Sequence, residues 1–191
     1  FTPDGKKVLV ANEGEFATGG NDGDGSVSII DISNGVANAT VQTATFTSFN
    51  GQDAALRAEG VRIFAGRSVS QDVEPEYIAV SADGTKAMVT LQEANAVAIL
   101  DIATGTFTDI VPLGLKDWFG LKLDVSDRDG TGGTAKINLV DDAPIFGLYM
   151  PDAISSYQVG GQTFYVMANE GDDRDDFMDP DETIRVGSGS Y

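Results

Sequence analysis

The sequence contains neither cysteine nor histidine. The lack of cysteine excludes disulfides and thiolate metal sites, and the lack of histidine excludes zinc sites built on imidazole. It also removes histidine as a general base, and with it the usual Ser-His-Asp arrangement. Any metal ion must therefore be held by oxygen ligands, which favours Ca²⁺ or Mg²⁺.

Basic side chains are scarce as well, because 30 acidic residues face 12 basic ones and the formal net charge is -18. Such a surface repels nucleic acid and anionic membranes, and it suits cations; the alternative is that the acidity only keeps the protein soluble. The sequence has no apolar run long enough to cross a membrane, so we expect no membrane insertion by this segment. It begins with Phe1 and not with Met, so we expect a longer protein whose signal peptide and anchor lie elsewhere.

The middle of the chain carries four short apolar segments, at residues 76–81, 86–91, 96–102 and 106–112. The turn residues Asp83-Gly84 and Thr104-Gly105 separate the first from the second and the third from the fourth. Four short strands joined by tight turns are typical of one blade of a β-propeller.

The same unit recurs before and after. Residues 7–11 and 26–32 match the second and third segments, whereas residues 151–154 and 164–168 match the first and second. Ala11-Asn12-Glu13-Gly14 returns unchanged as Ala168-Asn169-Glu170-Gly171. The sequence therefore predicts an all-β fold, a β-propeller of four-stranded blades in one domain fragment. It divides into a partial blade at 1–47, a full blade at 76–112, the start of a blade at 152–191, and insertions at 49–75 and 114–150.

A propeller closes with ~4–8 blades, so this chain is incomplete and needs the rest of the propeller for ring closure. We expect very little helix, apart from one short capped helix over residues 53–58 between Asn50 and Gly60. Strand direction alternates within a blade, which places all the long loops on one face. These loops are acidic, and function is usually carried by such loops on a rigid scaffold.

Carboxylates gathered on one face repel one another and need a cation, a nearby Arg or raised pKa values. Ca²⁺, which takes 6–8 oxygen ligands, is the simplest cation for them. The predicted metal ligands are Glu13, Glu15, Asp22, Asp24, Glu74, Glu76, Asp127, Asp129, Asp152, Glu170 and Asp172. The glycine-spaced acids at 21–25 are only a weak match to a calcium loop, and a solvated flexible loop is an equal alternative.

Several segments resemble the choice-of-anchor I family of bacterial propeller proteins. The matching segments are Val10-Ala11-Asn12-Glu13-Gly14-Glu15, residues 71–81, residues 110–114, Ser126-Asp127-Arg128-Asp129-Gly130 and Ala168-Asn169-Glu170-Gly171-Asp172. The blade also resembles propellers with the Tyr-Val-Thr-Asn type of repeat. The resemblance implies an exported protein that is extracellular or held at the cell surface. Some relatives are fused to alkaline phosphatases or nucleotidases, whose catalytic modules use histidine-containing metal motifs that this chain lacks.

The first hypothesis is thus a non-catalytic extracellular or cell-surface propeller module that binds Ca²⁺ and holds a protein or glycan partner on its long loops. The alternative is a metal-dependent hydrolase of alkaline phosphatase type, with a cation held at the propeller channel. Its ligands would be Glu13, Glu76, Asp152 and Glu170. A third hypothesis is a purely structural subunit of a surface layer or filament. No catalytic residue is assigned.

Overall fold

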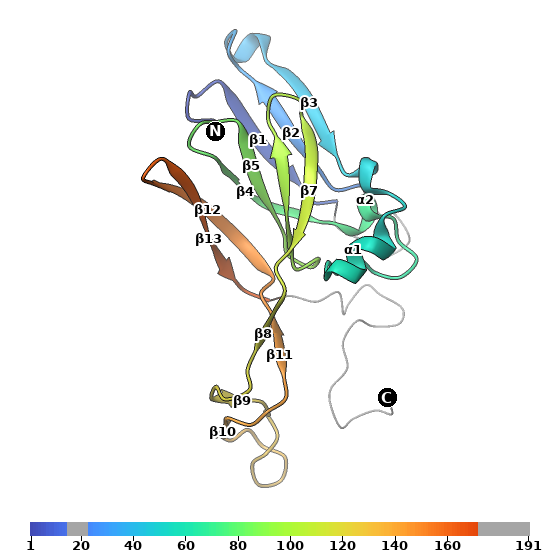
Figure 1. Cartoon of the computed structure of the whole chain (residues 1–191), viewed down its shortest axis with the longest axis vertical. Coiled ribbons are helices and arrows are strands. Elements are labelled where there is room, and N and C mark those ends of the chain that lie inside the picture. Colours follow the sequence, from blue (N-terminus) through green and yellow to red (C-terminus); the bar gives the residue numbers. More distant parts are fainter. Residues whose placement is uncertain (15–22, 172–191) are drawn as a thin grey trace. The chain divides into compact units, whose positions relative to one another are not determined.

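The computed structural model describes residues 1–14 and 23–171, which are mostly β-structure (Figure 1). The chain divides into two compact units. Unit 1 comprises Phe1–Leu113 and the chain from Met150 onward, and unit 2 is Gly114–Tyr149. The sheets of the described residues are small and antiparallel, and none of them closes on itself.

Unit 1 contains three antiparallel sheets, with the strand orders β1-β2-β3, β4-β5-β6-β7 and β12-β13. Their strands are β1 (Lys7–Asn12), β2 (Ser26–Asp31), β3 (Thr40–Thr45), β4 (Pro75–Val80), β5 (Lys86–Leu91), β6 (Ala96–Asp101), β7 (Thr106–Pro112), β12 (Pro151–Val159) and β13 (Gln162–Asn169). The four segments that sequence analysis expected between residues 76 and 112 are confirmed as neighbouring strands, in the expected order.

Two hairpins of unit 1 share one irregularity. In β4–β5, Pro75 pairs with Leu91, the register then shifts, and Ile78 pairs with Val89. In β12–β13, a proline at the start of the first strand again pairs with the last residue of the second, as Pro151 with Asn169, and the register shifts before the next pair. A β-bulge bends its strand and is conserved as a designed feature, so the shared bulge marks these hairpins as structural equivalents.

The core of unit 1 lies between the β1–β3 and β4–β7 sheets. Its fully buried members include Val27 from β2, Val89 from β5 and Leu100 from β6. β6 is buried along nearly its whole length, which fits its position as an inner strand of the larger sheet. Two short 3₁₀ helices flank β3 in the chain: η1 (Val36–Asn38) precedes it and η2 (Thr47–Phe49) follows it.

The segment between the first two sheets forms two short helices, α1 (Asp53–Glu59) and α2 (Val69–Asp72), near the end of β3 (Figure 1). α1 was predicted, and Gly60 ends it as expected with φ of 108° and N–H bonds to the carbonyls of Leu56 and Arg57. The predicted cap at Asn50 is wrong, since the N-cap residue is Gln52 and makes no side-chain bond. α2 was not predicted, because four residues are too few to show helical periodicity.

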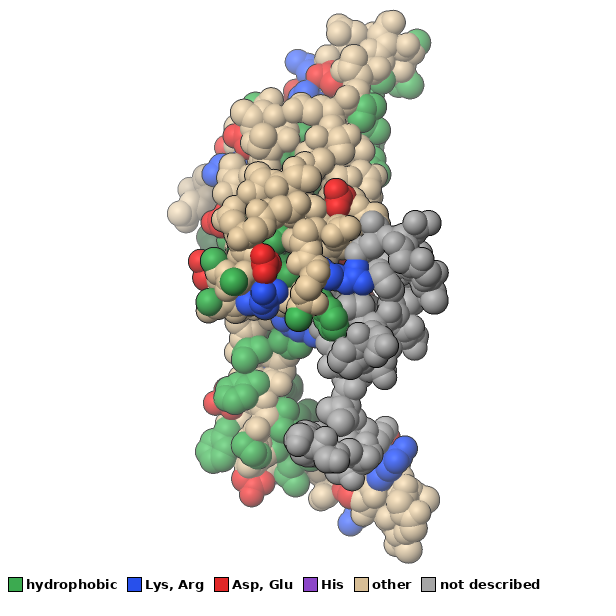
Figure 2. Space-filling model, turned by 90° about the vertical axis from the view of Figure 1, so that its right-hand side faces the viewer, with side chains coloured by type: hydrophobic (Ala, Val, Ile, Leu, Met, Phe, Trp, Pro, Cys, Tyr) green, Lys and Arg blue, Asp and Glu red, His purple; other side chains and the backbone are tan. Residues whose placement is uncertain are grey.

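Unit 2 coincides closely with the predicted insertion at 114–150, which sequence analysis treated as a loop. It instead holds two small antiparallel sheets, formed by β8 (Leu115–Asp117), β9 (Leu123–Asp124), β10 (Leu139–Val140) and β11 (Phe146–Leu148). Ala143 is its single buried residue. Apolar side chains are exposed over it instead (Figure 2), among them Leu115, Phe119, Leu121, Val125, Ile137, Leu139, Ile145, Phe146 and Leu148. Unit 2 therefore has no apolar core of its own.

Candidate functional site

The predicted metal ligands are spread over both units. Glu15, Asp22 and Asp172 lie outside the described residues. Asp127 and Asp129 are exposed in unit 2. The others belong to unit 1, where Glu13, Asp24 and Glu170 are exposed, Glu76 and Asp152 are half-buried, and Glu74 is buried. Among residues 1–14 and 23–171, no three acidic side chains gather at one point that could hold a metal ion.

A buried polar turn joins β5 to β6 at one end of unit 1. Asn95 lies in this turn with φ of 48° and is 1% exposed. Its main-chain carbonyl accepts the N–H of Leu113 at 3.0 Å, and its side-chain Oδ1 accepts the N–H of Met150 at 3.0 Å. Leu113 and Met150 are the residues at which the chain leaves and re-enters unit 1. Asn95 therefore binds both residues that flank unit 2 in the sequence, Leu113 and Met150.

Arg62 holds the same turn from another direction. Its guanidinium donates to the main-chain carbonyl of Glu93 at 2.7 Å, and its N–H donates to the carbonyl of Ala94 at 2.9 Å. The Glu93 side chain is also buried, with 6% exposure. Glu93 is not among the predicted metal ligands. In the repeat, Gln92 and not Glu93 holds the position of Glu13, because Leu91 ends β5 as Asn12 ends β1.

The 49–75 segment is held at this end through Ser70, which is 1% exposed. The side chain of Asn50 makes two bonds with it: Nδ2 donates to the Ser70 hydroxyl at 3.0 Å, and Oδ1 accepts the Ser70 N–H at 2.9 Å. The hydroxyl in turn donates to Asp24 at 3.1 Å, and the N–H of Gly25 donates to the Ser70 carbonyl. Asp24, a predicted metal ligand, is thus already part of a bond network that joins two loops.

Gly25 is required in this network by close approach. A Cβ atom at residue 25 would overlap the carbonyl oxygen of Val73 and lie 2.8 Å from Cδ of Pro75. Only glycine lets the two chain segments come this near. The start of β2 is therefore packed directly against the residues that precede β4.

The opposite end of the β4–β7 sheet carries an Asp-Gly turn. In this turn Asp83 Oδ1 accepts the Ser81 hydroxyl at 2.6 Å, the Thr85 N–H at 3.0 Å and the Thr85 hydroxyl at 2.8 Å. The Lys86 N–H donates to the Ser81 hydroxyl at 3.0 Å. Gly84 follows with φ of 72°, which is why glycine stands there.

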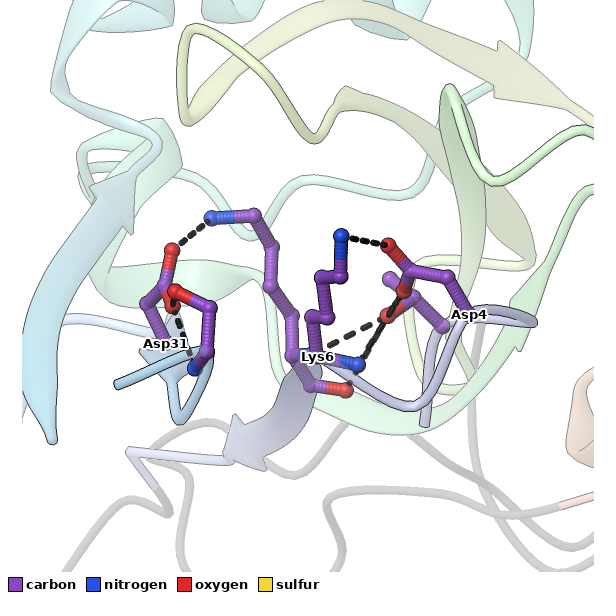
Figure 3. A network of polar contacts seen from close by, with 6 residues as sticks. Asp4, Lys6 and Asp31 are labelled. Atoms are coloured by element: carbon purple, nitrogen blue, oxygen red, sulfur yellow. Dashed lines mark hydrogen bonds and ion pairs between the residues drawn. The ribbon is translucent and has the colours of Figure 1, made fainter. Parts of the chain in front are cut away.

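The turn before β1 repeats three of these four bonds. Asp4 Oδ1 accepts the Thr2 hydroxyl at 2.7 Å and the Lys6 N–H at 3.1 Å, and the Lys7 N–H donates to the Thr2 hydroxyl at 3.0 Å. Figure 3 shows Asp4 beside Lys6, with Asp31 nearby at the end of β2. The Asp31 carboxylate forms an ion pair of 2.7 Å with Lys7. In the two turns, Oδ1 of Asp4 and Oδ1 of Asp83 accept the bonds that stabilise the turn, and Asp31 is paired with Lys7.

Hydrogen bonds to the ionised forms lower the pKa values of these aspartates. The Ser81 hydroxyl, followed by the N–H and hydroxyl of Thr85, lowers the pKa of Asp83 from 3.8 to about 2. The Thr2 hydroxyl is the main cause of the lowered pKa of Asp4, and the Lys7 ammonium is the main cause of the lowered pKa of Asp31.

These shifts predict a loss of stability in acid. A carboxylate whose pKa is lower in the folded state contributes its full stabilisation above the pKa of the unfolded chain, and loses it as pH falls to the folded value. For Asp83 the window runs from about pH 4 to about pH 2. We expect urea midpoints of the wild type to fall through this window, and Asp83→Asn to reduce the fall. Asp109→Asn, an exposed change on β7, should leave the slope as in the wild type. Equal slopes for wild type and Asp83→Asn would contradict the prediction.

Two open grooves lie on unit 1. One of about 540 Å³ runs along β4 and β12, and its lining includes Ile78, Ser155 and Tyr157. The other, of about 450 Å³, lies between the two Asp-Gly turns and includes Asp4, Lys7 and Asp83. The second groove combines carboxylates with an ammonium group, and these carboxylates are engaged in turn bonds.

A comparison with protein families decides what kind of chain this is. The family model of the choice-of-anchor I domain matches residues 1–189. The chain belongs to the choice-of-anchor I domain family. A comparison with curated proteins found no match. The choice-of-anchor I domain indicates a module associated with the cell surface. In the described part of this choice-of-anchor I domain, no helix has the length and apolar character needed to cross a membrane.

Proposed function

We propose that this choice-of-anchor I domain is a non-catalytic β-propeller module of an exported protein. Its acidic loop end binds Ca²⁺, and its long loops present a surface to a protein or glycan partner outside the cell or at its surface. The remaining blades come from chain segments beyond those described.

The repeated hairpin supports the propeller and is the observation that carries this proposal. β4–β5 and β12–β13 share a proline-led bulge, and three hydrogen bonds of the turn before β1 recur in the turn before β5. The β4–β7 sheet has four antiparallel strands in chain order, as a propeller blade does. A chain that repeats one such unit can stack it around an axis, because each copy then buries its faces against its neighbours.

The position of two glutamates supports cation binding. Glu13 and Glu170 are the first residues after the equivalent strands β1 and β13, and Gln92 holds that position after β5. Equivalent positions in a propeller lie around one axis, so equivalent carboxylates approach one another when the ring closes. With a net charge of -18, the protein gains most from a cation where such groups meet. The absence of histidine leaves oxygen donors, which suit Ca²⁺.

A calcium titration tests this proposal. A ligand that binds only the folded state stabilises it by about 2.7 kcal/mol at a concentration of 100 Kd. For a chain of this size we expect the melting temperature to rise by roughly 5–10 °C. Glu13→Gln and Glu170→Gln should reduce the rise, whereas Asp109→Asn removes an equal charge from the exposed β7 position and should not. Melting in EDTA gives the baseline for each variant.

The same samples distinguish the alternatives. A rise in melting temperature without turnover of a generic phosphate ester supports the non-catalytic module. Turnover that requires the metal and is lost in Glu13→Gln or Glu170→Gln would replace it by the metal-dependent hydrolase. If calcium changes neither stability nor activity, the acidic residues serve solubility and the calcium proposal is wrong.

A further inference from the structure

The chain contains two Asn-Gly steps, Asn34-Gly35 and Asn50-Gly51, in the described part of unit 1. Asparagine followed by glycine is prone to spontaneous deamidation, because glycine has no Cβ to hinder its own main-chain nitrogen. The two steps share the same residue pair, so their intrinsic reactivity in an unfolded chain is similar. A difference in the folded protein that exceeds the difference in the unfolded chain must come from the structure.

The side chain of Asn50 is held at both of its polar atoms. Its Nδ2 donates to the Ser70 hydroxyl and its Oδ1 accepts the Ser70 N–H. Ser70 itself is buried in α2 with 1% exposure, so its position is fixed by packing. Both bonds must break before Cγ of Asn50 can turn toward the nitrogen of Gly51. Each bond adds to the barrier.

Asn34 has no such restraint. It lies exposed in the turn after β2, and within the described residues its side-chain amide makes no hydrogen bond. Gly35 is exposed with φ of 85°, and a side chain placed there would meet no atom within 4 Å. The Gly35 N–H donates to the Ile32 carbonyl at 2.9 Å, and this bond must break before the Gly35 nitrogen can attack. Asn38 also holds the main chain of the turn, through its N–H to the Gly35 carbonyl at 2.9 Å and its Nδ2 to the Asn34 carbonyl at 3.1 Å. Cγ of Asn34, the electrophile, is therefore free to rotate. Only the Gly35 nitrogen, the nucleophile, must lose its bond to the Ile32 carbonyl.

We propose that Asn34 is a site of spontaneous deamidation in the folded protein, and that Ser70 protects Asn50 from the same reaction. The Gly35 nitrogen, after loss of its proton to hydroxide, attacks Cγ of Asn34. An N–Cγ bond forms, the Cγ–Nδ2 bond breaks, and the amide nitrogen leaves as ammonia. Water then opens the cyclic imide at either carbonyl and leaves aspartate or isoaspartate. The overall reaction consumes one water and no oxidant or reductant.

The product changes the turn chemically. A carboxylate appears at residue 34, three residues after Asp31, whose carboxylate accepts bonds from Ser33 and Lys7. In the isoaspartate form, the main chain also gains one methylene group between β2 and η1. The protein, with its net charge of -18, becomes more acidic by one charge for each event.

The test is incubation of the whole protein at mildly alkaline pH, followed by peptide mass analysis for the change of an amide to a carboxylic acid. A parallel sample unfolded in urea gives the intrinsic rate at each step. Two side-chain bonds must break for Asn50 to react, whereas one main-chain bond must break for the Gly35 nitrogen to attack Asn34. Each bond slows the reaction by about 2–10-fold. After division by the unfolded rate, we expect Asn34 to convert about fivefold faster than Asn50.

Two variants separate reactivity from folding. Ser70→Ala removes the hydroxyl partner and should raise the Asn50 rate while the Asn34 rate stays constant; a melting curve establishes that the variant is folded. Asn34→Gln should abolish conversion at residue 34 and leave residue 50 unaffected. The proposal is overturned if Asn50 converts as fast as Asn34 in the folded wild type. It is also overturned if neither converts during a period in which the unfolded sample converts at both steps.

Discussion

Phe46→Ala is expected to lower the free energy of unfolding of this choice-of-anchor I domain by about 3–5 kcal/mol. Phe46 follows β3 and is fully buried. Its ring stacks on that of Phe107 in β7, with 3.9 Å between centroids and 15° between planes. The pair joins the β1–β3 sheet to the β4–β7 sheet, so truncation both removes buried apolar surface and leaves a cavity between the sheets. Urea unfolding at neutral pH measures the loss.

Two further variants make this expectation specific. Phe46→Leu keeps most of the apolar volume and should cost much less, about 1–1.5 kcal/mol. Phe119→Ala removes the same side chain from a position that is 66% exposed, and should change the free energy of unfolding by less than about 0.5 kcal/mol. A loss at Phe46 no larger than that at Phe119 would show that the two sheets do not depend on this stack.

Asn95→Ala is expected to lower the free energy of unfolding by about 2–4 kcal/mol. The variant leaves the Met150 N–H without the Asn95 Oδ1 acceptor in a buried position. It also places a Cβ-bearing residue without a polar side chain at φ of 48°, a conformation that Asn tolerates better than Ala. Urea unfolding again gives the magnitude.

Asn95→Gly divides this effect into its parts. Glycine adopts positive φ without strain, so this variant loses the side-chain bond alone and should be less destabilised than Asn95→Ala. Asn38→Ala is the matched control, because it removes a side-chain bond to the Asn34 carbonyl in an exposed position, and it should change stability little. If Asn95→Ala is as stable as the control, the bond to Met150 does not anchor the chain where it re-enters unit 1.

The strands of this domain could be predicted from the sequence because their signals are local. Lys86–Leu91 is bounded by Asp83-Gly84, whose turn bonds all lie within a few residues. The same holds for α1, which ends where Gly60 can take a positive φ. The strands of unit 2 were missed because each has only two or three residues, too few for an alternation to be recognised.

The candidate site was harder to predict because its contacts join distant parts of the chain. Asp24 was chosen for its charge, yet its bond is to Ser70, 46 residues away. Glu74 was predicted as a metal ligand, whereas in the described fold it is buried, with 8% exposure. Charge and composition therefore identify which residues are acidic, but they do not say which of them are already engaged inside the protein.

The sequence by itself determined the β-class, the order of the strands, the repeat and the family resemblance, since all of these depend on short-range patterns of apolar and turn residues. Only the tertiary structure decided that Asn95 binds residues on both sides of unit 2, and that Ser70 holds Asn50 while Asn34 stays exposed. The physical reason is the range of the interactions. A turn is fixed by neighbours in sequence, whereas the partner of a buried polar group is fixed by how the sheets pack.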